Sequence, residues 1–348
     1  MRKPHPRRLV PIGLALLLAL PGAAAVTVPG LESPADPGPA APAPAPTSAG
    51  TVELLAKPAR VKLGRNASLG GRRLLPSGNP WNTKVDTAPV DPDSDALIAA
   101  ITGSLHADFG ADLDGAPFGI PYIVVKGSQK KVKVTFDYAE ESDPGPYPIP
   151  RNAPIEGGAD ADGDRHVLVL DRTHWKLYEL WDAHPVNGGT SWRAGSGAVF
   201  NLKSNKLRPA GWTSADAAGL PVLPGLVRYD EVKSGRITHA LRFTVARTRR
   251  AYLAPATHWA SSSTDPGLPP MGMRVRLKAG FDISGYPKAA RVILKAMKAY
   301  GMLLADNGQN WFVSGTPDPR WDDGVLDTIK RVPAEAFEVV EMNGVVEG

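Results

Sequence analysis

Carboxylates and aromatic rings alternate along one predicted strand, residues 176–182 (KLYELWD). In an extended strand, Glu179 and Trp181 point to one face, whereas Tyr178 and Asp182 point to the other. Each face therefore places one carboxylate beside one aromatic ring. This combination is typical of a sugar-binding cleft, and it is equally typical of a core strand that holds a hydrogen-bonded acid.

Glycoside hydrolysis would require a second acid near Glu179. The two carboxyl groups of a glycosidase lie about 5–5.5 Å apart for retention or about 6.5–9.5 Å apart for inversion. Asp182 is closest in sequence, but strand alternation separates it from Glu179 unless a β-bulge intervenes. Better partners lie farther along the chain: Asp230, Glu231, Asp282 and Asp306. We predict Glu179 and Asp230 as catalytic, and the alternative is that Glu179 is a structural acid bonded to arginine or backbone groups.

His239 begins the strand-like run 239–245 (HALRFTV), and Arg242 follows in the same run. Histidine titrates near neutral pH and can give or take a proton, while arginine can hold a carboxylate or a sugar hydroxyl. We predict His239 as catalytic and Arg242 as substrate-binding, on opposite faces of the strand. The alternatives are a packed, hydrogen-bonded histidine, or a lyase in which His239 works with a tyrosine such as Tyr229.

Eight tryptophans offer surfaces for stacking on sugar rings. An exposed indole packs well on the apolar face of a pyranose, so we predict Trp181, Trp259 and Trp311 as substrate-binding. Most tryptophans are nevertheless buried. We therefore expect about two of the eight to face a cleft.

A metal site is the other chemical hypothesis. Asp160, Asp162 and Asp164 occupy alternate positions of a glycine-containing loop, as the first ligands of a calcium loop do, and residues 91–95 repeat this spacing. Neither loop completes the EF-hand pattern, so structural Ca²⁺ and a solvated acidic turn are both retained. No P-loop, G-x-G-x-x-G or complete G-x-S-x-G motif occurs, and we expect no required cofactor.

Residues 1–25 predict export. A basic segment precedes the apolar run 9–20, and Ala23-Ala24-Ala25 offers a cleavage site near Ala25. Because the apolar run is shorter than the ~20 residues that span a bilayer, we expect a signal peptide and a secreted protein, extracellular or periplasmic, without membrane insertion. Residues 26–51 form a Pro/Ala-rich linker, typical of an extended spacer.

The charge and the cysteine content narrow the class of protein. Four of the 40 basic residues lie in residues 1–25, so the +5 charge of the whole chain falls to about +1 after cleavage. This balance argues against nucleic acid as a partner. Cysteine is absent, so no disulfide stabilises the exported fold. We expect a monomer that binds a polysaccharide or oligosaccharide.

The elements that must position these residues are mostly strands. Apolar alternation and turn residues predict a central hairpin of residues 165–170 and 176–182, a second hairpin at Asn307-Gly308 and several further strands. Helices are predicted near residues 93–102, 229–234, 287–300 and 322–330. With 36 glycines and 35 prolines favouring turns, we predict that residues 52–348 form a single β-sandwich or jelly-roll-like domain with a few peripheral helices.

Several phrases together resemble a group of secreted bacterial proteins to which no activity is assigned. They are GDRHVLVLD, LYELWDA, LPGLVRYDEVKSGRITHALRF, PPMGMRVRLKAGFDISG and KAYGMLLADNG. The resemblance extends over residues 79–340 and supports treating this region as one unit. It implies no functional residue.

The sequence therefore leads to three hypotheses about function. The first is an enzyme that hydrolyses an extracellular polysaccharide by carboxylate acid–base catalysis. The second is a carbohydrate-binding or cell-surface protein without catalysis. The third is a polysaccharide lyase that uses His239.

Overall fold

The computed structural model describes residues 60–113 and 115–348. The chain divides into two units, Met1–Leu55 and Ala56–Gly348, and every described residue belongs to the second. The predicted signal peptide and linker lie outside the described residues. Strands make up 25% and helices 16%, in several sheets of which none is closed, so the predicted mainly-β class is confirmed.

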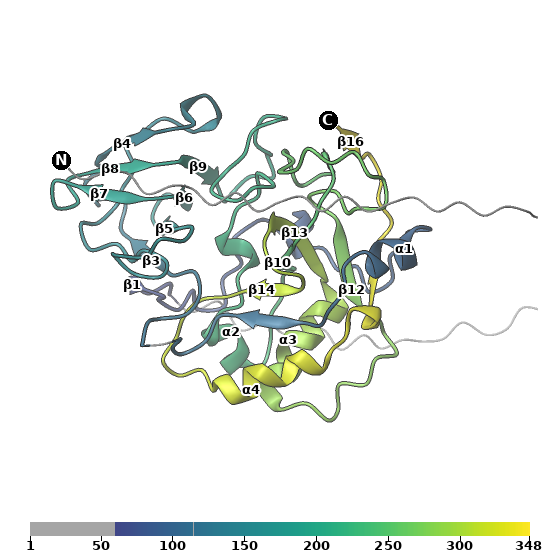
Figure 1. Cartoon of the computed structure of the whole chain (residues 1–348). Helices are drawn as coiled ribbons and strands as arrows, with labels where there is room; N and C mark the ends of the chain where they lie inside the picture. The colour runs from purple at the N-terminus through teal and green to yellow at the C-terminus, as the bar shows by residue number, and fades with distance from the viewer. Residues whose placement is uncertain (1–59, 114) are drawn as a thin grey trace, which may run out of the picture. The chain divides into compact units, whose positions relative to one another are not determined.

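A five-stranded sheet contains the central hairpin (Figure 1). In spatial order its strands are β1 (Gly64–Arg65), β3 (Tyr122–Val125), β5 (Val167–Asp171), β6 (Lys176–Trp181) and β9 (Ser196–Asn201). Strands β5 and β6 pair antiparallel with Glu179 opposite Leu168, which confirms the predicted hairpin. Strand β3 runs parallel to β5, whereas the other neighbours are antiparallel.

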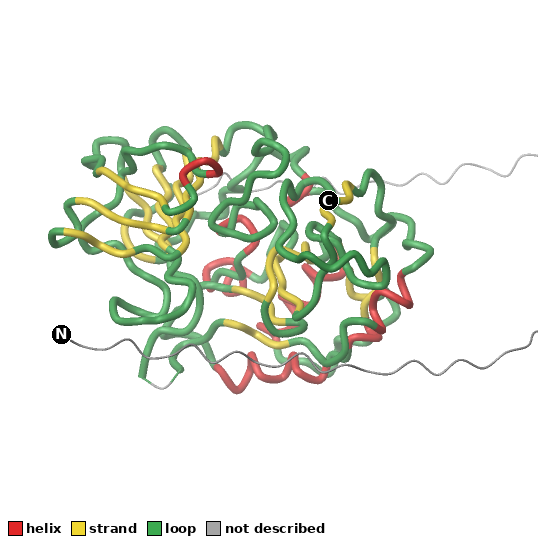
Figure 2. The backbone as a smooth tube through the Cα atoms, turned by 45° about the horizontal axis from the view of Figure 1, so that its top comes forward, coloured by secondary structure: helices red, strands yellow, loops and turns green. Residues whose placement is uncertain are grey.

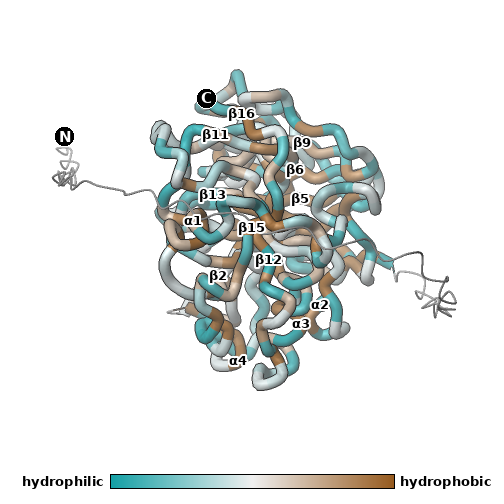
Figure 3. Tube along the Cα trace, turned by 90° about the vertical axis from the view of Figure 1, so that its right-hand side faces the viewer, coloured by the Kyte–Doolittle hydropathy of each residue, from teal (hydrophilic) through white to brown (hydrophobic). Residues whose placement is uncertain are grey.

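Both faces of this sheet are buried, because both alternating sets of side chains are apolar. In β5, Leu168 and Leu170 join the larger hydrophobic core, while Val167 and Val169 join a smaller one. A three-stranded sheet covers the smaller core and contributes Val134 and Trp192 to it. Its strands are β4 (Lys133–Phe136), β8 (Ser191–Ala194) and β7 (His184–Val186). Figure 3 shows hydrophobic, brown stretches of chain at β5, β6 and β9.

A six-stranded mixed sheet forms the second large layer of strands. In spatial order its strands are β15 (Phe337–Val339), β12 (Arg274–Leu277), β13 (Met302–Asn307), β10 (Leu241–Val245), β14 (Phe312–Ser314) and β2 (His106–Asp108). A separate pair joins β11 (Ala251–Tyr252) to β16 (Val346–Glu347) near the carboxyl end.

The predicted hairpin at Asn307-Gly308 is wrong, because its two strands do not pair with each other. Strand β10 lies between them, parallel to β13 and antiparallel to β14. The loop passes around the end of β10, where Gly308 donates its N–H to Val245 at 3.0 Å and Trp311 donates to Thr244 at 3.1 Å. An Asn-Gly dipeptide signals a local reversal of the chain, but it does not specify which strand the returning segment joins.

Most helical segments are short and lie near the six-stranded sheet, and Figure 2 shows one red turn beside the other group of strands. The α-helices are α1 (Ser94–Ala99), α2 (Tyr229–Ser234), α3 (Lys288–Ala299) and α4 (Asp323–Asp327). The 3₁₀ helices are η1 (Pro80–Asn82), η2 (Ala139–Glu141), η3 (Leu223–Gly225), η4 (Thr328–Arg331) and η5 (Ala334–Ala336). Helix α2 ends at Gly235, whose φ of 86° suits a residue without a side chain. Within the described part of the chain, no helix is long and apolar enough to cross a membrane.

Candidate functional site

A cleft of about 490 Å³ draws its lining from both large sheets. Trp181 and Ser196 come from the five-stranded sheet, and Asp306 comes from β13 of the six-stranded sheet. Asn307 also lies on β13, and the other lining residues lie in loops or on η2: Tyr138, Glu141, Asp164, Thr213, Ser214, Ala215, Asp216, Ala217, His258 and Ala260. The volume falls within the range of small-molecule sites, and carboxylates and aromatic rings converge on it.

Asp216 and Asp306 form the central acid pair of the cleft. Arg242 donates from Nε to Asp216 Oδ2 at 3.2 Å, and its Nη2 lies 3.0 Å from the same oxygen. That Nη2 also lies 3.9 Å from Asp306 Oδ2. The side chain of Asp216 is fully buried, whereas that of Asp306 is 26% exposed. Asp306 is therefore the member of the pair that a ligand can reach.

Burial raises the pKa of both acids. For Asp216, burial is the largest cause, Arg242 opposes it and Asp306 adds to it, so that the pKa rises to about 7. For Asp306, burial again dominates, Arg242 opposes it and the charge of Asp164 raises the pKa further. Two interacting acids titrate as a pair. Burial therefore favours the protonated form of the pair more than it is favoured in an ordinary exposed aspartate.

Asp164 supplies an exposed carboxylate at the same cleft. Its Oδ1 accepts a hydrogen bond from Trp181 Nε1 at 3.1 Å, which fixes the indole beside it. Tyr138, 52% exposed, lies next to Trp181 with the ring centroids 6.3 Å apart. The two rings form an aromatic wall for a flat apolar ligand face.

A buried charged pair, His166 and Glu156, lies next to the acids. His166 Nδ1 lies 2.5 Å from Glu156 Oε2, and Nε2 lies 2.8 Å from the carbonyl oxygen of Ala215. Both partners only accept hydrogen bonds, so both ring nitrogens donate and the ring is an imidazolium. Burial lowers the pKa of His166, but the charge and hydrogen bond of Glu156 prevail and raise it to about 9. Burial and the charge of Glu156 raise the pKa of neighbouring Asp108 to about 6.

Glu179 is fully buried and does not line the cleft. Its two carboxylate oxygens accept hydrogen bonds from the backbone N–H groups of Val222 and Leu223, each at 2.9 Å. Burial raises its pKa to about 7, and these two hydrogen bonds oppose the rise. Glu179 therefore connects β6 to the start of η3, in agreement with the alternative of a structural acid. Asp182 does not join it and instead bonds His184 at 2.7 Å.

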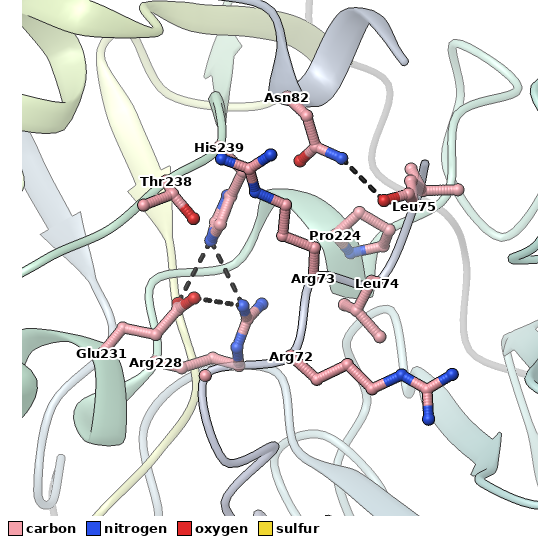
Figure 4. Close-up of a pocket in the computed structure, with 11 residues that line it drawn as sticks. Arg72, Arg73, Leu74, Leu75, Asn82, Pro224, Arg228, Glu231, Thr238 and His239 are labelled. Atoms are coloured by element: carbon pink, nitrogen blue, oxygen red, sulfur yellow. Dashed lines mark hydrogen bonds and ion pairs between the residues drawn. The ribbon is translucent and has the colours of Figure 1, made fainter. Parts of the chain in front are cut away.

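His239 lies in a separate small pocket of about 10 Å³, lined also by Arg228 and Glu231 (Figure 4). Its Nδ1 lies 2.7 Å from the carbonyl oxygen of Ala240, and its Nε2 lies 3.1 Å from Glu231 and 3.3 Å from Arg228. Figure 4 shows these side chains converging on one another. The space holds about one water molecule, so a sugar ring does not fit.

Asp230 stands apart from both cavities. Its Oδ2 accepts hydrogen bonds from the hydroxyl of Ser68 at 2.8 Å and from the N–H of Leu69 at 3.2 Å. These bonds tie the first turn of α2 to an early segment of the domain. Asp230, His239 and Glu179 thus bond different partners, and none of the three lines the larger cleft.

The predicted binding residues have different environments. Trp181 lines the cleft. Arg242 is buried beside it and reaches the acids rather than the open space. Trp259 neighbours the lining residue His258 and stacks between that ring and Tyr252. Trp311 is completely buried and donates its Nε1–H to Ile101, so it presents no surface to a ligand.

The predicted calcium ligands do not converge. Among residues 60–113 and 115–348, no group of three or more histidine, aspartate or glutamate side chains is arranged to hold a metal ion. Asp160 and Asp162 are exposed, and Asp164 bonds Trp181 instead. The calcium site stays a prediction.

Sequence reasoning missed Asp216, His166 and Tyr138 as members of this region. Asp216 belongs to Ser214-Ala215-Asp216, which predicts a helix cap; here Ser214 Oγ accepts the N–H of Asp216 at 2.9 Å in a turn without a helix. His166 lies inside a predicted strand, and only the fold brings Glu156 to it. The sequence did point to Asp306, which is among the acids predicted as partners of Glu179.

Comparisons of the chain with models of known protein families, with curated proteins and with solved structures find no match. The function proposed below is therefore argued from the geometry of the cleft.

Proposed function

We propose that the protein hydrolyses a glycan in the cleft, with Asp306 as general acid and Asp164 as general base or nucleophile. The observation that carries this proposal is the arrangement of Asp306 beside the buried Asp216–Arg242 pair, at a cleft that Asp164 and Trp181 also line. A general acid must reach the substrate and hold a proton near the working pH. Asp306 is partly exposed, and burial raises its pKa above that of an ordinary aspartate, which supports this role.

Asp216 and Arg242 act as positioning residues in this proposal. Asp216 is inaccessible, and its carboxylate accepts two hydrogen-bond contacts from Arg242 and a third from the N–H of Ala218 at 3.1 Å. These donors favour the charged form of Asp216, and we therefore assign the role of proton donor to the more exposed Asp306. Arg242 is held in turn by Ser314, whose hydroxyl accepts from Nη1 at 2.7 Å.

Asp164 complements Asp306 because it is exposed, and because its charge raises the pKa of Asp306. One of its oxygens is occupied by Trp181, which leaves the other for a water molecule or a sugar carbon. Tyr138 and Trp181 would hold the ring that is cleaved or its neighbour by stacking.

The strongest alternative is a non-catalytic carbohydrate-binding protein, because the aromatic wall would serve a lectin equally well. The lyase hypothesis loses support, since the pocket of His239 has room for about one water molecule. Export through residues 1–25 and a sandwich or jelly-roll arrangement of the sheets remain parts of the proposal. The sandwich or jelly-roll arrangement is consistent with the mainly-β class.

The test incubates the purified protein with a panel of polysaccharides. Two products are measured: reducing ends, and unsaturated sugars by their ultraviolet absorbance. Reducing ends without that absorbance support hydrolysis, whereas both together indicate a lyase. D306N and D164N should each lower kcat by at least about 10²-fold, while the exposed Asp282, which does not line the cleft, provides the control D282N. Binding of a glycan without any product would establish the lectin alternative, and full activity of D306N would remove Asp306 from its proposed role.

A further inference from the structure

We propose that the glycan taken by the cleft carries positive charge, as a polymer of amino sugars with free ammonium groups does. This inference rests on the function proposed above and specifies the substrate class of the same cleft. It follows from the charges that line the cleft and, independently, from the aromatic wall.

The lining of the cleft is acidic. Glu141, Asp164, Asp216 and Asp306 contribute carboxyl groups, and no lysine or arginine stands among the lining residues that the structure describes. Three buried cations near the cleft are already paired, Arg242 with Asp216, His166 with Glu156 and Arg208 with Asp143. None of these three cations is therefore free to hold an anionic substrate.

Two of the carboxylates keep an oxygen for a ligand. Asp164 accepts from Trp181 through Oδ1, and Glu141 accepts from the N–H of Thr213 through Oε2 at 3.2 Å. In the part of the chain that the structure describes, neither acid forms an ion pair with lysine or arginine. An ammonium group in the cleft would be their nearest counter-ion, whereas a uronic acid would be repelled.

The aromatic wall favours the same class of substrate. The faces of tyrosine and tryptophan rings carry negative charge density and attract cations. Tyr138 is 52% exposed, and Trp181 lies beside it. A sugar with an ammonium substituent would gain both the stacking contact and the attraction between the cation and the rings. The acetylated sugar would keep only the stacking contact.

The experiment compares three oligosaccharides of equal length by calorimetry on the full chain: glucosamine, N-acetylglucosamine and galacturonic acid oligomers, under mildly acidic conditions. We expect the glucosamine oligomer to bind at least about tenfold more tightly than the acetylated one, with a difference that shrinks in high salt. The galacturonic acid oligomer should bind most weakly. An oligolysine peptide of equal charge serves as a competitor of another chemical class.

A matched pair of variants isolates the electrostatic contribution. Glu141 lines the cleft, whereas its exposed neighbour Glu140 does not. E141Q should weaken binding of the glucosamine oligomer about fivefold and leave the acetylated oligomer unchanged, while E140Q should change neither. Circular dichroism establishes that both variants fold.

The outcomes separate this inference from the proposed function. If the acetylated or the galacturonic acid oligomer binds as tightly as the glucosamine oligomer, or more tightly, the inference of a positively charged substrate is overturned. This holds even if that oligomer is hydrolysed and the hydrolase proposal stands. Binding selective for the ammonium form without product would sustain the inference and refute hydrolysis. Tighter binding of oligolysine than of any glycan would also overturn it, in favour of a basic peptide.

Discussion

Asp216 and Asp306 share the guanidinium of Arg242, whose Nη2 lies 3.0 Å from one carboxylate and 3.9 Å from the other. The two Oδ2 atoms therefore lie within about 7 Å of each other, so their charges interact strongly. Because Arg242 contacts Asp216 through two nitrogens, it favours the charged form of Asp216. Asp306 is the more exposed of the two acids, and burial raises its pKa, so we propose it as the proton donor of the cleft.

Replacing Asp216 with asparagine should shift the pH dependence of activity. The substitution removes a negative neighbour and leaves Arg242 with Asp306 as its acidic partner, so the pKa of Asp306 falls. The alkaline limb of the kcat/KM profile, where the general acid loses its proton, should then move to lower pH. An unmoved limb would show that the two acids are not linked in catalysis.

The same variant leaves a buried guanidinium without its principal partner. Removal of one member of a buried ion pair typically costs about 3–5 kcal/mol. The unfolding temperature of D216N should therefore be determined first by thermal denaturation. The pH profile is then measured below that temperature.

The pair of His166 and Glu156 predicts that the protein is less stable in alkali. The pKa of His166 rises from 6.5 to about 9 on folding, so the folded state binds the proton more tightly than the unfolded state. The resulting stabilisation is fully present below pH 6.5 and is lost as the pH rises to about 9, by an amount on the order of 3 kcal/mol. We expect the Tm to fall over this window.

Glu156→Gln provides the control for this prediction. Without the carboxylate, burial and the charge of Arg242 lower the pKa of His166, and the smaller effect of Asp164 opposes them. The fall of Tm between pH 6.5 and about 9 should then largely disappear. A variant with the same decline as the wild type would assign the alkaline sensitivity to other groups.

Local sequence patterns predict only part of this arrangement. The apolar runs around residues 167–181 correctly predict the hairpin, because alternation and turn residues act locally. They correctly leave a structural acid as an alternative for Glu179, but they do not show which backbone groups it binds. Asp216, Asp306 and Arg242 meet only when β10 inserts between β13 and β14, a pairing that depends on contacts distant in sequence.

Glu179→Gln separates structural from catalytic roles. The carboxylate accepts two backbone N–H groups, whereas the amide offers one acceptor and sets its NH₂ against the other donor. The unpaired buried group should lower the free energy of unfolding by about 1–3 kcal/mol, measured by urea denaturation. Because Glu179 does not line the cleft, kcat should remain within about twofold of the wild type. A folded variant without activity would return Glu179 to the catalytic acids.

Tyr138→Ala tests the aromatic wall with little risk to the fold, because half of this side chain is exposed. Loss of one stacking surface should weaken glycan binding about 2- to 10-fold, corresponding to roughly 0.5–1.5 kcal/mol. The effect should appear in Kd or KM and leave kcat almost unchanged, since the ring holds the substrate without taking part in proton transfer. Val186→Ala, at an exposed apolar residue that does not line the cleft, is the matched control. If both variants bind glycan equally well, the ligand does not stack on Tyr138, and Trp181 alone would have to form the wall.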